Sequence, residues 1–151
     1  MKRLSELQTS AKALITAFLI SMGLNHAFAG WLSLEISNSA AGGEKEHFQY
    51  KTLVYLLRMS HQHSFGHGMM YAAMGAVFLM STLPERLKTI LILMPFIGAG
   101  ADLTGWWLEK YAAGDYEWLS IVGGILFCTG FTVMAGRVFW ELWFTKGEQT
   151  T

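Results

Sequence analysis

Four long apolar segments dominate the sequence and decide what kind of fold it can adopt. They cover about residues 11–34, 52–83, 89–108 and 116–144, with short polar breaks between them. A helix needs roughly 20 apolar residues to cross the hydrocarbon core of a bilayer, and each segment reaches that length. An isolated strand in lipid would leave its backbone groups without hydrogen-bond partners, so helices are expected. The sequence therefore predicts an all-α integral membrane protein, a single domain of 151 residues folded as an antiparallel four-helix bundle.

The composition agrees with a protein whose main solvent is lipid. Hydrophobic residues make up 52% of the chain and charged residues 15%, well below the roughly 25% of ordinary soluble domains. Basic and acidic residues number 11 each, so the basic surface of a nucleic-acid-binding protein is not expected. The single cysteine, Cys128, excludes an internal disulfide and a CxxC motif. The lipid bilayer is therefore the expected partner, and nucleic acid is not.

The distribution of charge predicts how the bundle is oriented. Basic residues concentrate near both chain ends and in the connection between the second and third segments, whereas the other two connections are mostly acidic. The positive-inside rule then places both termini in the cytoplasm. The basic group is Lys2, Arg3, Lys12, Arg86, Lys88, Arg137 and Lys146, and the other connections carry Glu35, Glu44, Glu46, Glu109, Asp115 and Glu117 against Lys45, Lys51 and Lys110.

A second interpretation of the first segment stays open. The basic start MKR, an apolar run, and then Ala27 and Ala29 also fit a signal peptide cleaved after Ala29. Against cleavage, the apolar character resumes in WLSLEI, and an uncut segment completes an even number of spans. We therefore expect the first segment to remain as a membrane span.

Ionisable residues gather in one half of the predicted bilayer. The second segment contains HQHSFGHG, which places His61, His63 and His67 in its outer half to middle. Counting along the other segments places His26 near the outer end of the first and Asp102 near the outer end of the third. Ionisable groups at this depth are costly and normally face the bundle interior, where they pair. A polar site in the outer half of the bundle is therefore expected.

The spacing of the histidines leaves two kinds of ligand open. His63 and His67 lie four residues apart and share one helix face, whereas His61 points to nearly the opposite side. Imidazoles from two helices can ligate haem iron, and two histidines at this spacing can also bind one metal ion. Nearby aromatic residues, methionines and glycines favour haem. The candidate sets are His26 with His63 or His67 for haem b, and His61, His63, His67 and Asp102 for a transition-metal ion such as copper, zinc or iron.

Other interpretations of these residues also stay open. The histidines could serve proton or quinol chemistry, or simply make hydrogen bonds between helices. Asp102 could be a partner of a ligating histidine, a proton acceptor, or half of an ion pair with Arg58. His47 is expected to be solvated in a polar loop. No glutamate forms an HExxH motif and no nucleophile has an obvious base, so no catalytic residue is expected and the chain is not expected to be an enzyme by itself.

Small side chains recur along two of the segments and predict close helix packing. In the second segment Gly66 and Gly68 flank His67, and a small-residue ridge, defined as Gly68, Ala72 and Ala76, follows. In the fourth segment a small residue stands at every fourth position. These faces predict contacts between helices and a homo- or hetero-oligomer. The fourth-segment ladder is Ser120, Gly124, Cys128, Thr132 and Gly136.

Several stretches resemble a known group of proteins. The stretches AKALITAFLISMGL, HQHSFGHGMMYAAMGAVF, LPERLKTILILMPF and DLTGWWLEKY are similar to those of a largely uncharacterised group of small four-span bacterial inner-membrane proteins. The resemblance covers most of the chain and implies its fold and a multi-pass location in the bacterial inner membrane. The histidine-bearing second segment also resembles membrane b-type cytochromes in general architecture.

These observations lead to one main functional hypothesis. The chain is expected to be a membrane electron-transfer subunit with haem b or a metal centre in the outer half of the bilayer. Such a subunit would pass electrons between quinol and a periplasmic cytochrome. The alternatives are a non-catalytic membrane subunit or assembly factor that docks through small-residue and tryptophan-rich faces, and a membrane protein that handles copper or zinc.

Overall fold

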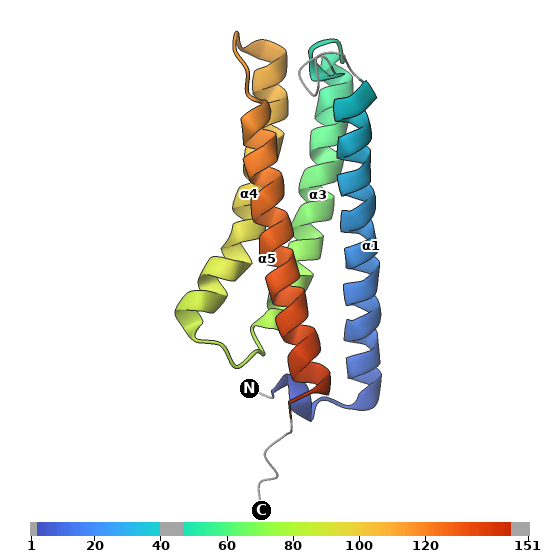
Figure 1. Cartoon of the computed structure of the whole chain (residues 1–151), viewed down its shortest axis with the longest axis vertical. Coiled ribbons are helices and arrows are strands. Elements are labelled where there is room, and N and C mark those ends of the chain that lie inside the picture. The colour runs from blue at the N-terminus through green and yellow to red at the C-terminus, as the bar shows by residue number, and fades with distance from the viewer. Residues whose placement is uncertain (1–2, 40–46, 146–151) are drawn as a thin grey trace, which may run out of the picture.

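The structure is a bundle of long helices (Figure 1). It is a computed structural model and describes residues 3–39 and 47–145. Within these residues the successive long helices run in alternate directions, so that the start of the first and the end of the last lie at the same end of the bundle (Figure 1). This confirms the all-α prediction. The elements are η1 (Leu4–Glu6), α1 (Thr9–Ser39), α3 (Leu53–Phe78), α4 (Glu85–Tyr111) and α5 (Glu117–Trp143).

The connection between α3 and α4 differs from the prediction. Helix α3 ends at Phe78, before the predicted end of the second segment at residue 83, and α4 begins at Glu85, before the predicted start at residue 89. Pro84 is the N-cap of α4 with φ −60°, the angle that its ring imposes, and Glu85 places an acidic side chain in the first turn. Both features favour the start of a helix. Much of LPERLK is therefore helical.

Three of the described helices are long and apolar enough to cross a membrane. They are α1 over Thr9–Ile36, α4 and α5. Helix α3 has the necessary length, at 26 residues, but it does not meet the same standard of hydropathy. Arg58, Gln62 and the histidines lower its apolar character. Some of the residues that were predicted to set the orientation lie outside the described parts of the chain. They are Lys2, Glu44, Lys45, Glu46 and Lys146.

The tightest packing in the bundle joins α4 and α5 at glycines. A Cβ added to Gly98 would lie 2.6 Å from the carbonyl oxygen of Gly123, and one added to Gly123 would lie 2.5 Å from the carbonyl oxygen of Gly98. Farther along, a Cβ added to Gly130 would lie 2.9 Å from Cδ of Pro95. Only hydrogen fits at these positions. The two backbones therefore approach each other as membrane helices do when small residues form the contact.

Apart from Ser120, which packs beside Gly105, the predicted every-fourth ladder on α5 does not form this contact. A Cβ added to Gly124 or Gly136 would meet no atom within 4 Å, and Cys128 is exposed. Steps of four residues advance about 400° around a helix, so such a ladder drifts by about 40° per step. Steps that alternate between three and four follow a straight contact line. The buried line on α5 accordingly includes Ser120, Gly123, Gly130, Met134, Val138 and Glu141.

The glycines near His67 also differ from the prediction. A Cβ added to Gly66 or Gly68 would meet no atom within 4 Å among the described residues, so neither glycine lies at a contact between the described helices. On α3 it is Gly75 that packs against another helix, with an added Cβ 3.3 Å from Ile92. The small-residue ridge of α3 faces away from the other described helices, since Ala72 and Ala76 are exposed.

Helix α1 contacts the rest of the bundle mainly through its first two thirds. Leu4 of η1 is fully buried in the main hydrophobic cluster, and Trp143 Nε1 donates to Thr16 Oγ1 at 3.1 Å. Farther along, the His26 ring stacks on Phe131 with centroids 4.2 Å apart. Beyond this point most side chains of α1 are exposed. The last third of α1 therefore leaves room for a cavity.

A buried carboxylate ties the last turns of α5 to the connection between α3 and α4. Glu141 is 2% exposed. It accepts hydrogen bonds from the Thr82 backbone N–H at 3.0 Å, the Thr82 hydroxyl at 2.8 Å and Arg137 Nε at 2.6 Å. A buried charge is tolerated when its lone pairs are paired in this way.

Substitution of Gly98 tests the backbone contact. Gly98→Ala should destabilise the protein by about 1–3 kcal/mol, because the new methyl group meets backbone atoms that cannot move aside. Gly100→Ala is the control on the same helix, and it should be neutral or stabilising because nothing lies within 4 Å of its Cβ. Thermal unfolding in detergent measures both. Equal melting temperatures would contradict the contact.

Substitution of Glu141 tests the carboxylate network. Glu141→Gln should cost about 1.5–3 kcal/mol, because charge-assisted hydrogen bonds to Thr82 and Arg137 are weakened in a buried place. Glu85→Gln is the matched control. Its side chain is 79% exposed, and the buried ammonium group of its partner Lys88 keeps a second hydrogen bond to the carbonyl oxygen of Leu79, so a smaller loss is expected. Chemical denaturation of both variants gives the comparison, and an effect of the same size at both positions would argue against the network.

Candidate functional site

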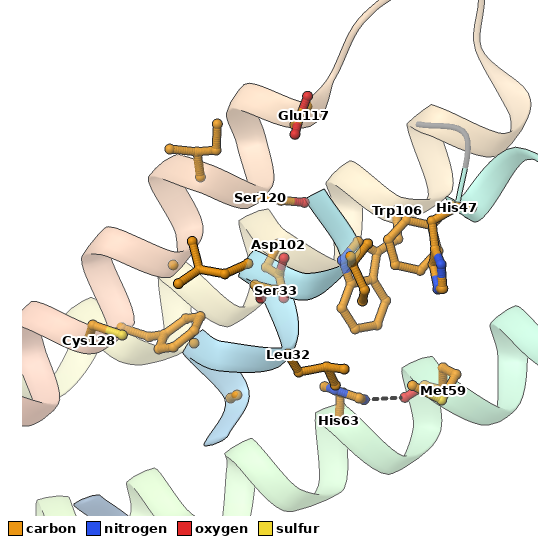
Figure 2. Close-up of a pocket in the computed structure, with 18 of the residues that line it drawn as sticks. Leu32, Ser33, His47, Met59, His63, Asp102, Trp106, Glu117, Ser120 and Cys128 are labelled. Atoms are coloured by element: carbon orange, nitrogen blue, oxygen red, sulfur yellow. Dashed lines mark hydrogen bonds between the residues drawn. The ribbon is translucent and has the colours of Figure 1, made fainter. Parts of the chain in front are cut away.

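A cavity of about 630 Å³ lies between the last third of α1 and the facing parts of α3, α4 and α5 (Figure 2). Its size is within the range of small-molecule and cofactor sites. Most of its lining is apolar, and several polar side chains reach it from different helices. The polar or titratable residues that line it include His26, Ser33, His47, His63, His67, Asp102, Glu117, Ser120 and Cys128.

His26 is held in a defined orientation by its own helix and by aromatic neighbours. Its Nδ1 lies 2.8 Å from the carbonyl oxygen of Met22, and because a carbonyl only accepts, Nδ1 carries the proton. Nε2 therefore has the lone pair and lies 3.5 Å from the Tyr71 hydroxyl. The ring also contacts Phe127 and stacks on Phe131. These contacts fix the imidazole and leave its Nε2 with only the long contact to the Tyr71 hydroxyl among the described residues.

His63 has the same arrangement on α3. Its Nδ1 donates to the carbonyl oxygen of Met59 at 3.0 Å, as the dashed line in Figure 2 shows, which leaves the lone pair on Nε2. Its ring meets Trp106 edge-on with centroids 4.8 Å apart, and it meets His67 edge-on at 5.5 Å. A backbone carbonyl that fixes the tautomer and orientation of an imidazole is the usual partner of a histidine that ligates a metal.

His67 lies one turn farther along α3, and His61 does not join it. The His67 ring stacks on Tyr71 at 5.5 Å, and its buried Nδ1 has no hydrogen-bond partner among the described residues. His61 is exposed and does not line the cavity. It stands two residues before His63, and residues two apart lie on nearly opposite faces of a helix. The structure thus brings together His26, His63 and His67.

Asp102 projects from α4 into the same cavity, next to Ser120 and Trp106 (Figure 2). The glycine contact between α4 and α5 positions it, since a Cβ added to Gly123 would lie 3.1 Å from its Cβ. The Ser120 hydroxyl is buried next to the Asp102 carboxylate, although the contact between them lacks the geometry of a full hydrogen bond. No ion pair between Asp102 and Arg58 occurs among the described residues, and Arg58 is exposed.

The predicted four-residue metal set does not assemble. The described residues contain no group of three or more histidine, cysteine, aspartate or glutamate side chains that could hold a metal ion. The members of that set are His61, His63, His67 and Asp102, and His61 lies outside the cavity. A haem group needs fewer protein ligands, because its iron takes only one or two from the protein.

Several residues of the cavity were not predicted from the sequence. Trp106 and Glu117 line it, although no role was predicted for Trp106 and Glu117 was counted among the charges of a connection. His47, predicted to be solvated, is half-buried at the cavity, and burial followed by the charge of Lys51 lowers its pKa. Phe127 supplies an aromatic wall. The sequence shows only where these residues stand along the chain. Their contacts across the cavity depend on how the helices pack.

The comparisons with known proteins identify the class of this chain. Residues 35–149 match the model of the family Aq_1264_TM, which is described as a transmembrane helical domain. The chain belongs to this family and is a membrane protein. The match begins in the last part of α1 and includes α3, α4 and α5, so it contains His63, His67 and Asp102 but not His26. No protein of curated function and no solved structure matches the chain significantly.

Replacement of Ser120 tests whether its hydroxyl is bonded in the folded protein. Ser120→Ala should cost clearly less than 1 kcal/mol, because the contact of its hydroxyl with the Asp102 carboxylate lacks the geometry of a full hydrogen bond. Thr82→Ala, which removes a hydroxyl bonded to Glu141, should cost about 1 kcal/mol. Thermal unfolding of the two variants is compared. A loss at Ser120 as large as that at Thr82 would show that the hydroxyl has a partner.

Proposed function

We propose that this protein is a membrane-embedded electron-transfer subunit whose outer cavity holds haem b. One observation carries the proposal. His26 and His63, from two different helices, line one cavity, and each has Nδ1 bonded to the carbonyl oxygen four residues earlier. Two imidazoles prepared in this way offer their Nε2 atoms as ligands of an iron between helices.

The rest of the cavity suits a flat, mostly apolar group. Its volume is about 630 Å³, and its walls include the aromatic rings of Phe48, Trp106 and Phe127. Cofactors of this kind occupy the space between the helices of bundles, where apolar side chains surround them. The buried Ser120 hydroxyl and the half-buried His47 ring are donors that could bind the carboxylate groups of a haem.

Bound haem would supply one-electron chemistry at its iron, and the residues of this chain would control that chemistry. The carbonyl groups of Met22 and Met59 hold the two imidazoles in one tautomer. Trp106 and Phe127 would provide apolar walls beside the bound group. The protein would in this way set the ligand field and the polarity around the iron.

Asp102 is proposed to accept protons at the outer side of the cavity. It lies beside Ser120, and Glu117 also lines the cavity near the first turn of α5. A carboxylate in such a place is costly unless it binds or exchanges a proton. Together with the haem, this arrangement would let the subunit pass electrons from quinol to a periplasmic cytochrome while protons leave on the outer side.

We propose that α3 is the fourth membrane span. Its polar residues lower its hydropathy, but His63 and His67 turn toward the cavity rather than toward lipid. The alternating helix directions and the basic residues Lys12, Arg86 and Arg137 at one end of the bundle support termini in the cytoplasm and a bacterial inner-membrane location.

A second candidate is a non-catalytic subunit of a larger membrane complex. The observation in its favour is the small-residue ridge of α3, which faces outward and could receive a helix of a partner or of a second copy. Purification with a larger complex and without any bound cofactor would support this role. A copper- or zinc-handling role has less support, because no three-ligand group assembles within the described residues.

The test of the haem proposal is an absorption spectrum of the purified protein before and after reduction with dithionite. A Soret band that sharpens and shifts on reduction is expected in the wild type. His26→Ala and His63→Ala should each lose most of it, since each removes one proposed ligand. His61→Ala is the matched control on α3 and should keep the band, because His61 lies outside the cavity.

Three results would contradict the assignment. A protein that stays colourless when haem is supplied during expression would remove the haem proposal. Full haem content in both His26→Ala and His63→Ala would show that the ligands are wrong. Loss in His67→Ala with retention in His63→Ala would move the ligand on α3 to His67. The intact mass of the purified protein checks that residues 1–29, which include His26, are retained.

A further inference from the structure

A second, smaller cavity lies on the other side of the α3 histidines. It measures about 360 Å³ and opens between α1 and α3. His63 and His67 line it as well as the larger cavity, so these two imidazoles stand in the wall between the two spaces. Its mouth is formed by exposed Asn25 and Gln62, one from each helix. We call this second cavity the α1–α3 groove.

The two amides at the mouth are unusual for surfaces that face lipid. Neither the Asn25 nor the Gln62 side chain makes a hydrogen bond with a described residue. An amide that leaves water without gaining a partner loses several kcal/mol, and polar groups at such places in membrane proteins generally mark a site of function. The convergence of two such amides from two helices therefore points to a ligand that supplies the missing hydrogen bonds.

The remaining lining of the groove suits a ring. Met22 and Met70 contribute flexible thioether side chains, which pack well against aromatic rings. Gly66 lines the groove without filling it with a side chain, and a Cβ added there would meet no atom within 4 Å. The space is near the lower limit for small-molecule sites, enough for one substituted ring but not for a macrocycle.

We infer that the α1–α3 groove binds the head group of a lipid-soluble quinone or quinol. Its ring oxygens would pair with Asn25 and Gln62, whose amides can both donate and accept and so fit either redox form. His67 provides a third polar side chain in the groove. The apolar tail would remain among the lipids beside α1 and α3. Binding needs only the groove, whereas use of the bound quinol as electron donor rests on the proposed haem function.

Matched glycine substitutions test the groove with the full-length protein. Gly66→Leu fills it, whereas Gly23→Leu adds the same side chain on α1 outside it, and neither new Cβ meets an atom within 4 Å. The probe is decylubiquinone, titrated calorimetrically into detergent-solubilised protein with the micelle-only heat subtracted. Saturable binding is expected in the wild type and in Gly23→Leu, and at least about tenfold weaker binding in Gly66→Leu.

Two further comparisons distinguish a specific head-group site from nonspecific binding to an apolar surface. Asn25→Leu and Gln62→Leu should each weaken decylubiquinone about tenfold, because each loses a hydrogen bond while the groove stays apolar. Decylbenzene, which has the tail but no oxygens, should not bind saturably. Equal affinity in all variants, partition into micelles alone, or decylbenzene binding as tight as that of the quinone would overturn the inference. Quinone binding by a protein without a Soret band would leave this site standing and reject only the haem proposal.

Discussion

The contact between the backbones of α4 and α5 is the interaction on which the rest of the structure depends. Gly98 and Gly123 let the two helices touch where any side chain would clash. This contact sets Asp102 beside Ser120 at the edge of the helix pair. Because α4 and α5 make their closest contact with each other, α1 and α3 pack beside them with more space, and the cavities lie in that space.

The polar groups of the bundle follow from the cost of polarity in lipid. At one end, Glu141 is paired with Thr82 and Arg137 and fastens the connection between α3 and α4. Near the middle, His26 and His63 satisfy one nitrogen each with a carbonyl of their own helix. The remaining nitrogen of His26 has only the 3.5 Å contact with the Tyr71 hydroxyl, and that of His63 has no hydrogen-bond partner among the described residues. The Nε2 atoms can therefore take part in binding. For this reason His26 and His63 support a functional proposal more strongly than Glu141 does.

The two cavities place the α3 histidines His63 and His67 in the wall between two spaces. The groove between α1 and α3 reaches them from one side, and the larger cavity, with Asp102 and Glu117, reaches them from the other. In the proposed scheme a quinol head, a haem and a proton acceptor would therefore lie in sequence across α3. The loose packing of the last third of α1 keeps the larger cavity open.

The sequence by itself determined the helical fold, the positions of the long helices and the residues from which a site could be built. These follow from local properties, since apolar length and backbone hydrogen bonding in lipid leave no alternative to helices. Only the tertiary structure decided which small residues form a contact and which histidines meet. The ladder through Gly124 and Cys128 proved to lie off the α4 contact, and His61 proved to lie outside the cavity. The physical reason is that several faces of an apolar helix are compatible with lipid, and the face that packs is chosen by the fit between neighbouring backbones.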